Sequence, residues 1–307
     1  MAHKKDCVVT GAFGYTGRHI TKRLLENGYS VRTLTSRIDR EGDGEFGGRV
    51  AVYPFNFDAP DELVRSMDGA DVLFNTYWIR FEYTGITFER AVKNSLALIS
   101  AAERAGVRRI VHISIANPSL ESPFPYYRGK AQVEKAIVES RLSYAVVRPS
   151  VIFGDRGILI NNIAWFLRHT PVFGVPGDGK YGLSPVFVED MANLMVGTAQ
   201  SDENVVLDAV GPETFEFNYL LSMMKIALNS RTLIMHLPPT AAIFAAGVIG
   251  KILGDVVLTK DEVGALMAGL LVSKSAPTCP TKLSDWIVDN KDWLGRSYMS
   301  EIGSRRR

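Results

Sequence analysis

Apolar residues in the first half of the chain alternate between two spacings, one typical of strands and the other of helices. Residues 7–9, 72–74 and 110–113 are almost continuously apolar, as strands buried on both faces require. Longer stretches between them carry apolar residues at helical spacing. The alternation predicts an α/β protein with a doubly wound parallel sheet, in which right-handed helical crossovers join the strands. The expected strands are residues 6–10, 31–35, 50–55, 72–74, 110–114 and 144–148, and the expected helices are residues 14–27, 61–67, 87–105 and 126–139.

Beyond residue 154 the pattern becomes irregular, which indicates a second, smaller region. Pro171, Pro176 and the four glycines between residues 174 and 182 predict a loop. Further strands are expected at residues 186–188, before a helix from Glu189, and at residues 205–209, before C-terminal helices. The chain is therefore divided into a sheet domain, residues 1–154, and a C-terminal region, residues 155–307, from which residues 185–210 return to the sheet.

Composition and charge exclude several functional classes. Of the 307 residues, 46% are hydrophobic and 22% charged, close to globular averages, which excludes a disordered or fibrous chain. The net charge of +2 is too balanced for bulk nucleic-acid binding. Two cysteines exclude a disulfide framework, and no Cys/His cluster has metal-site spacing, so we expect no metal.

Targeting and membrane signals are weak. The N-terminus lacks the apolar segment of a signal peptide. The apolar stretch at residues 241–253 is interrupted by Lys251 and is too short to span a bilayer. It is consistent with a packed helix or with a hydrophobic contact to a partner. We therefore expect a cytoplasmic protein without a transmembrane segment.

The strongest chemical signal is the glycine-rich turn at residues 10–17, which follows the first expected strand and opens the first expected helix. Three glycines let the backbone turn tightly, approach a pyrophosphate and pack helix against strand. The helix N-terminus supplies free N–H groups and a positive dipole for the phosphates. The alternative is a purely structural turn. The expected cofactor-binding residues of this Rossmann turn are Gly11, Phe13, Gly14, Tyr15, Thr16 and Gly17.

The GxxGxxG spacing of this turn resembles that of the extended and atypical short-chain dehydrogenases/reductases, which include the NAD-dependent epimerases/dehydratases. Six further features follow in family order, so the resemblance covers nearly the whole chain. Within the atypical branch, the chain resembles the NmrA-like and complex-I-accessory-subunit-like members. The six features are Asp58, Asn75-Thr76, Asn94, the YxxxK motif from Tyr126 to Lys130, Arg148-Pro149 with Gly154, and residues 185–190.

The resemblance implies a role for each motif residue. Asp58 would contact the adenine, and Asn75 and Thr76 would lie over the cofactor. Tyr126 would exchange a proton with a substrate oxygen, while Lys130 would lower the pKa of that phenol and hold the nicotinamide ribose. Because the two residues are four apart, they project from one helix face. The alternative is a chance Tyr/Lys spacing on an amphipathic helix.

The chain departs from the family pattern at the end of the fifth expected strand. Extended members have two small polar residues there, the second being the catalytic Ser or Thr. Here Ser114 is followed by Ile115, whose side chain cannot form a hydrogen bond with a substrate oxygen. Ser114 is the candidate replacement, with Asn117 or Ser119 as alternatives; otherwise the catalytic triad is incomplete.

Cofactor choice depends on the end of the second expected strand. An acidic residue there would bind the 2′-hydroxyl of the adenosine ribose, and none is present. Thr35, Ser36 and Arg37 instead offer donors suited to a 2′-phosphate, and Arg32 or Arg40 could assist. NADP(H) is therefore favoured over NAD(H), although Arg37 could also be an ordinary exposed loop residue.

Two functions from different classes fit these residues. The first is an NADP(H)-dependent oxidoreductase or epimerase-like enzyme that acts on an unidentified small molecule and could form a homodimer. The second is a non-catalytic dinucleotide-binding protein that regulates or assembles a complex. Trp78 follows the fourth strand, where it would either contact a ligand or pack against the loop. The candidate substrate contacts in the C-terminal region are Asn161, Asn162 and Trp165.

Overall fold

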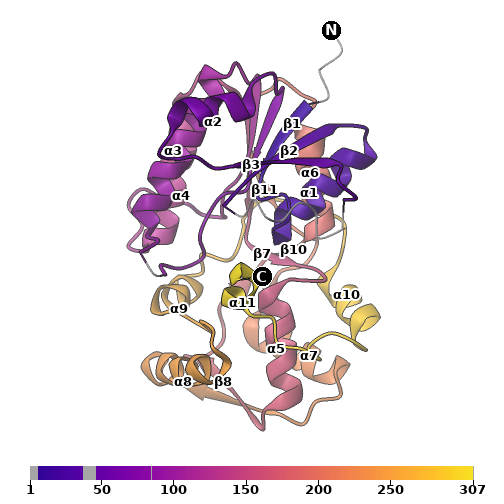
Figure 1. Cartoon of the computed structure of the whole chain (residues 1–307). Helices are drawn as coiled ribbons and strands as arrows, with labels where there is room; N and C mark the ends of the chain where they lie inside the picture. The colour runs from indigo at the N-terminus through magenta and orange to yellow at the C-terminus, as the bar shows by residue number, and fades with distance from the viewer. Residues whose placement is uncertain (1–5, 37–45, 84, 307) are drawn as a thin grey trace. The chain divides into compact units, whose positions relative to one another are not determined.

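A computed structural model describes residues 6–36, 46–83 and 85–306 of the chain (Figure 1). The chain forms two compact units, each of which contains segments that are distant in sequence. The first unit comprises Met1–Arg148 and Val188–Asp208, and the second comprises Pro149–Phe187 and Ala209–Arg307.

The first unit is built on a sheet that has seven strands among the described residues, in the order β11-β6-β5-β4-β1-β2-β3. The pairings from β6 to β3 are all parallel. This arrangement confirms the predicted doubly wound α/β fold. The strands are β1 (Asp6–Thr10), β2 (Ser30–Thr35), β3 (Val50–Pro54), β4 (Val72–Asn75), β5 (Arg109–Ile113), β6 (Ser143–Pro149) and β11 (Val205–Ala209).

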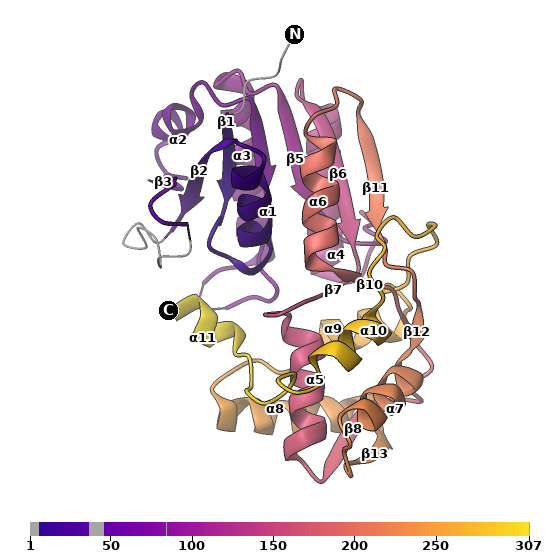
Figure 2. The ribbon, with the colours of Figure 1, turned by 90° about the vertical axis from the view of Figure 1, so that its right-hand side faces the viewer.

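Helices cover both faces of this sheet, which explains why its central strands are apolar along their whole length. Figure 2 shows α1 (Tyr15–Glu26) beside α6 (Val188–Thr198), and the two helices pack together on one face. On the other face, α2 (Pro60–Met67), α3 (Phe88–Arg104) and α4 (Pro125–Glu139) pack in series (Figure 1). Every residue of β4 and β5 is buried between these layers.

The strand order places a topological switch point beside β1. The chain runs from β1 outward through β2 to β3, and then crosses back to β4 on the other side of β1. At such a point the two connections leave the carboxyl ends of neighbouring strands in opposite directions and open a crevice for a ligand. We therefore expect a ligand at the carboxyl ends of these two strands, which are marked by Thr10 in β1 and Asn75 in β4.

The second unit consists of short strand pairs and helices around its own apolar core, which includes Phe153, Leu220 and Ile287. One expectation is wrong here. Residues 172–176, assigned to a loop because of their glycine and prolines, form strand β8 and pair in parallel with β13. The prolines flank or end the strand, where their missing N–H is tolerated. The elements are β7 (Val151–Phe153), α5 (Ile158–His169), β8 (Val172–Pro176), β9 (Gly182–Leu183), β10 (Pro185–Phe187), β12 (Phe215–Glu216), α7 (Phe217–Ala227), β13 (Leu233–Leu237), α8 (Pro239–Leu253), α9 (Lys260–Met267), α10 (Leu283–Asn290) and α11 (Glu301–Arg306).

Two neighbouring asparagines of α5 fasten the C-terminal segment to this unit. The Asn162 amide donates to the backbone oxygen of Met299 and accepts from its N–H, both at 2.9 Å. Asn161 similarly donates to Ser297 and accepts from the Gly295 N–H. Both side chains are buried, so the backbone groups of residues 295–299 replace the water that these amides would otherwise bind.

We predict that Asn162→Leu will release the end of the C-terminal segment. The substitution preserves approximate volume but leaves both polar groups of Met299 without their buried partner, which costs about 1–3 kcal/mol. Hydrogen exchange measured by mass spectrometry should become faster in peptides that cover residues 297–303, while β5 stays protected as an internal control. Unchanged exchange at residues 297–303 would show that other contacts hold the segment.

Candidate functional site

The glycine-rich turn has the geometry that a bound diphosphate requires. Gly11 adopts the left-handed backbone conformation, with φ +67°, and the Gly14 N–H donates to the Gly11 carbonyl at 2.8 Å. At Gly17, an added Cβ would lie 2.1 Å from that same carbonyl oxygen. Glycine is therefore needed at residue 11 for the turn and at residue 17 for the approach of α1 to β1.

Threonine hydroxyl groups form hydrogen bonds that hold the glycine-rich turn and the ends of β1 and β4 in place. The Thr33 hydroxyl donates to Val9 O at 2.9 Å and accepts from the Ala12 N–H at 3.0 Å. Between the ends of β1 and β4, the Thr10 hydroxyl accepts from the Thr76 N–H at 2.7 Å, and the Thr76 hydroxyl donates to Thr10 O. Our sequence prediction placed Thr10 in the glycine-rich turn but gave the Thr10 and Thr33 hydroxyls no role, although hydroxyl residues within apolar strands were the available signal.

The beginning of α1 leaves its amide groups available to a ligand. Its N-cap, Gly14, has no side chain that could cap the helix, and its first turn contains no acidic residue. Gly14 is exposed, and Phe13, Tyr15 and Thr16 around it are half-buried. An uncapped N-terminus with a positive dipole, next to a glycine turn, fits the phosphates of a dinucleotide.

The YxxxK pair lies on α4, and both of its members contact the indole ring of Trp78. The Lys130 ammonium lies 4.7 Å from the centroid of the Trp78 ring and donates to Ile113 O at 2.7 Å. The same Trp78 ring meets the Tyr126 ring edge-on, with centroids 5.9 Å apart. Between the two residues along the helix, an added Cβ at Gly129 would lie 3.0 Å from the indole. Trp78 therefore covers the stretch of α4 from Tyr126 to Lys130.

Burial changes the protonation of the two bases at this end of the sheet. Lys130 is only 3% exposed, and desolvation lowers the pKa of its ammonium to about 7 even though Glu134 opposes the shift. Burial, followed by the positive charge of Lys130, holds the pKa of His112 well below its usual range. At neutral pH the site therefore contains a neutral imidazole and a lysine that is easily deprotonated.

Buried polar atoms without a hydrogen-bond partner gather at the carboxyl ends of β4 and β5. Among the described residues these include Asn75 Nδ2, Trp78 Nε1 and Ser114 Oγ. Ser114 is 2% exposed and follows Ile113, the lysine's acceptor, while Ile115 is buried beside it. Since buried polar groups are rarely left unsatisfied, these atoms suit the hydroxyl and amide groups of a bound cofactor.

The remaining predicted residues fall into three groups. Ser36 and Asp58 are exposed in the segments that follow β2 and β3, whereas Arg37 and Arg40 lie outside the described residues. In the second unit, Trp165 stacks on His169 with ring centroids 4.9 Å apart. The amides of Asn161 and Asn162 are engaged with residues 295–299, as described above. Substrate contact by these residues therefore stays a prediction.

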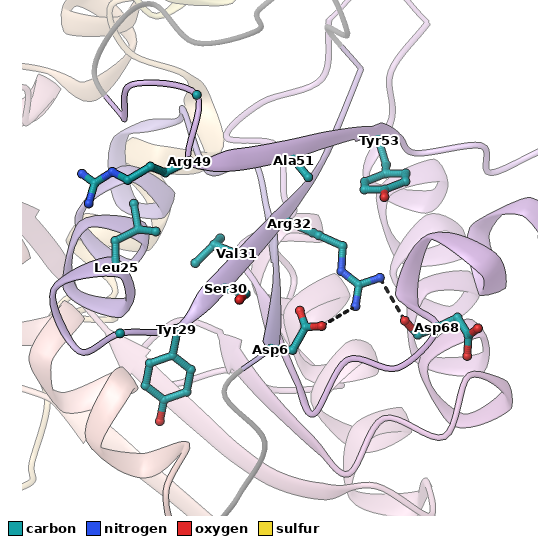
Figure 3. A pocket seen from close by; sticks show the side chains of 12 residues that line it. Asp6, Leu25, Tyr29, Ser30, Val31, Arg32, Arg49, Ala51, Tyr53 and Asp68 are labelled. Carbon is teal, nitrogen blue, oxygen red and sulfur yellow. Dashed lines mark hydrogen bonds and ion pairs between the residues drawn. The ribbon is translucent and has the colours of Figure 1, made fainter.

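A pocket of about 830 Å³ lies at the opposite, amino edge of the sheet, formed by the starts of β1, β2 and β3 (Figure 3). The Arg32 guanidinium points into it and donates to the Asp6 carboxylate at 3.1 Å and to Asp68 O at 2.9 Å. Arg32 therefore cannot assist a cofactor phosphate at the carboxyl edge, which corrects that expectation. In the part of the chain that the structure describes, no group of three metal-ligating side chains comes together.

We predict that Gly17→Ala will abolish dinucleotide binding and destabilise the fold, because its methyl group would press α1 away from the Gly11 carbonyl. Gly197→Ala in α6 is the matched control, since nothing lies within 4 Å of an added Cβ there. Isothermal titration with NADPH and NADH should detect binding by the control and none by Gly17→Ala. Equal binding by the two variants would remove the turn from the cofactor site.

We also predict that Lys130 makes stability increase with pH. Between pH 7 and the ordinary lysine pKa of 10.5, the unfolded chain retains a proton that native Lys130 has lost. As the pH rises, the wild type should therefore become more stable relative to Lys130→Met. We expect the difference in unfolding free energy to grow by roughly 1 kcal/mol per pH unit. Urea unfolding from pH 7 to pH 9 measures it. Lys135→Met, at an exposed position of α4, should show no such slope.

Comparisons with known proteins agree with this geometry. Residues 11–160 match a family model described as NAD(P)H-binding. The chain is 26% identical over 287 residues to NADH dehydrogenase (ubiquinone) 1 alpha subcomplex subunit 9, mitochondrial, of Arabidopsis thaliana; the match covers 87% of this chain and 71% of the relative. It is 21% identical over 245 residues to a photosystem II assembly factor of Cyanidium caldarium, covering 79% of this chain and 78% of that protein.

Solved structures show the same fold. A nucleoside-diphosphate-sugar epimerase of Staphylococcus aureus superposes with a TM-score of 0.71 at 17% identity, over 96% of this chain and 98% of the epimerase. A triphenylmethane reductase of Citrobacter sp., complexed with NADP(H), gives 0.65 at 16% identity, over 93% and 99%. The predicted resemblance is therefore confirmed: residues 11–160 match an NAD(P)H-binding model, and the chain has the fold of these epimerases and reductases.

Proposed function

We propose that this protein binds NADP(H) as a resident dinucleotide, whose role is to stabilise the fold and to report redox state within a larger assembly. In this proposal the cofactor is not turned over with a substrate. The observation that carries it is the position of Trp78, which covers the α4 surface from Tyr126 to Lys130.

Proton transfer to a substrate needs an accessible phenol that is coupled electrostatically to the lysine ammonium. Tyr126 is half-buried, and its ring meets two aromatic rings edge-on, those of Trp78 and Phe88, at 5.9 and 5.8 Å. Ile115 occupies the position at which extended enzymes have a catalytic hydroxyl. Burial also makes the charge of Lys130 weak at neutral pH. These features together favour a site that binds a dinucleotide without completing a catalytic triad.

The residues of the first unit support dinucleotide binding more strongly than they support catalysis. The Gly11–Gly17 contact and the open start of α1 provide for the diphosphate, and the NAD(P)H-binding family model spans this region. The preference for NADP(H) rests on the hydroxyl residues Thr35 and Ser36 and on the basic residue Arg37, with no carboxylate among residues 33–37 at the end of β2.

The relatives support a role in a complex. One is named as a subunit of a mitochondrial NADH dehydrogenase and another as a photosystem assembly factor. We therefore propose a macromolecular partner for this chain. Homodimerisation and a cytoplasmic location stay predictions.

A second candidate, an NADP(H)-dependent oxidoreductase, is favoured by the unpartnered Ser114 hydroxyl, which follows the Ile113 carbonyl that accepts from Lys130. When bound, NADPH would supply a hydride to a substrate carbonyl carbon. Tyr126 would give its proton to the carbonyl oxygen, and Lys130 would stabilise the phenolate that results. The Trp78 side chain would have to move away from α4 for this reaction, and Asn161, Asn162 and Trp165 would be the predicted substrate contacts.

The test separates binding from turnover. We predict that the purified protein will contain or take up NADP(H), that binding will raise its unfolding temperature, and that no carbonyl compound or quinone in a broad panel will accelerate NADPH oxidation. Tyr126→Phe should retain the affinity of the wild type, because the phenol then makes no contribution to binding. Lys130→Met should bind more weakly, with Lys135→Met as its matched control.

Two outcomes would contradict the proposal. NADPH oxidation that a panel compound stimulates and that Tyr126→Phe lowers by about 10²–10⁴-fold would establish the oxidoreductase. Absence of measurable affinity for either nicotinamide dinucleotide would remove the resident cofactor itself.

A further inference from the structure

Helix α8 is apolar on opposite faces, although one of these faces is exposed. Ala242, Ala246 and Gly250 recur every four residues and are buried against the second unit. A second stripe has the same spacing, but Phe244, Val248 and Ile252 are 76%, 46% and 80% exposed. A helix that is hydrophobic all round is normally covered on every side, so the second stripe indicates a missing apolar environment.

The length of α8 restricts what this environment can be. The helix has 15 residues, and no helix in the described part of the chain is long and apolar enough to cross a membrane. A short apolar segment of this kind is either a core helix or one that lies in a membrane interface. The exposure of Phe244 and Ile252 argues against the core.

The charges around α8 favour docking on a negatively charged surface. From residue 217 to residue 260, which covers α7, β13 and α8, the only acidic residue is Asp255. That carboxylate is buried and accepts hydrogen bonds from the Tyr298 hydroxyl and from the backbone N–H groups of Glu301 and Ile302. The basic residues of the segment, none of them buried, are Lys225, Arg231, Lys251 and Lys260.

Exposed apolar side chains accompany these basic groups along the same segment. Along α7, β13 and α8 the accessible charged side chains are all positive, and the exposed Asp261 follows them in α9. An apolar surface with such charges is complementary to a bilayer that contains anionic lipids, since acyl chains cover the apolar side chains and lipid phosphates pair with the lysines and arginines. Besides the α8 stripe, the exposed large apolar residues of this segment are Tyr219, Ile226, Leu233 and Met235.

We propose that α8 docks the protein on the surface of an anionic phospholipid bilayer. The stripe of Phe244, Val248 and Ile252 enters the boundary between headgroups and acyl chains, and Lys251 at the C-terminal end of the helix binds lipid phosphate. A second copy of the chain that docked through the same segment would bring basic groups against basic groups, so the two surfaces would not be complementary. A different protein would need an apolar surface that carries acidic groups. The inference concerns the second unit and does not depend on the proposed role of the dinucleotide.

Co-sedimentation of the full chain with vesicles tests this proposal. One set contains phosphatidylcholine and phosphatidylglycerol at 7:3, and the other contains phosphatidylcholine alone. We expect binding to the anionic vesicles that weakens as NaCl is raised, because salt screens the lysine–phosphate attraction. The double variant Phe244→Asp, Ile252→Asp should lower the affinity by roughly tenfold or more, since it removes two apolar side chains that enter the bilayer on docking. Lys251→Glu should weaken binding to the anionic vesicles and not to the neutral ones.

A matched pair of substitutions distinguishes docking from general surface hydrophobicity. Val248 and Val138 are 46% and 47% exposed, on α8 and α4 respectively. Val248→Asp should weaken binding, whereas Val138→Asp should not. Thermal unfolding of each variant, recorded in parallel, shows that any loss of binding occurs in folded protein.

A fluorescence measurement locates the helix directly. In Phe244→Trp, the added emission should be quenched by brominated phospholipids in anionic vesicles, while Val138→Trp should retain its emission. Lack of binding to the anionic vesicles at low salt would overturn the proposal. So would equal binding by Val248→Asp and Val138→Asp, or a dimer in sedimentation velocity that the Phe244→Asp, Ile252→Asp variant dissociates.

Discussion

The approach of α1 to the end of β1 is the constraint on which the nucleotide site depends. A single backbone oxygen, that of Gly11, lies where any side chain at Gly17 would have to go. This contact fixes how far the helix start stands from the sheet, and therefore where its free N–H groups point. The Thr10–Thr76 hydrogen bonds then join the end of β1 to the segment after β4, beside the glycine-rich turn.

Lys130 joins α4 to the end of β5 through its hydrogen bond to Ile113 O, and its environment limits the chemistry of the candidate site. Desolvation lowers the pKa of this ammonium to about 7, whereas catalysis in this fold needs it charged beside the phenol. Ribose hydroxyls of a bound cofactor would give the lysine polar partners that Trp78 does not. The same burial that weakens proton transfer therefore makes cofactor binding and fold stability depend on each other.

The sequence predicted the first unit well because its signals are local. Apolar runs, helical spacing and the glycine turn each occupy a few consecutive residues, and the structure has a strand or helix at each expected place from residue 6 to residue 149. The position of Trp78 over Lys130 could not be predicted, since it joins residues 52 positions apart through the packing of a loop on a helix. Strand β8 was missed because its partner, β13, lies about 60 residues later and the prolines masked its extended character.

The asparagines of α5 show why a polar residue near an expected cleft is weak evidence of ligand binding. Asn161 and Asn162 have the donors and acceptors that substrate recognition needs, yet their amides satisfy the backbone of residues 295–299. A chain segment that returns to a helix can use the same chemistry as a substrate, and sequence spacing cannot distinguish the two. The glycine turn is stronger evidence because its backbone conformation and its close contact with α1 permit only glycine at residues 11 and 17. No such steric requirement selects asparagine at residues 161 and 162.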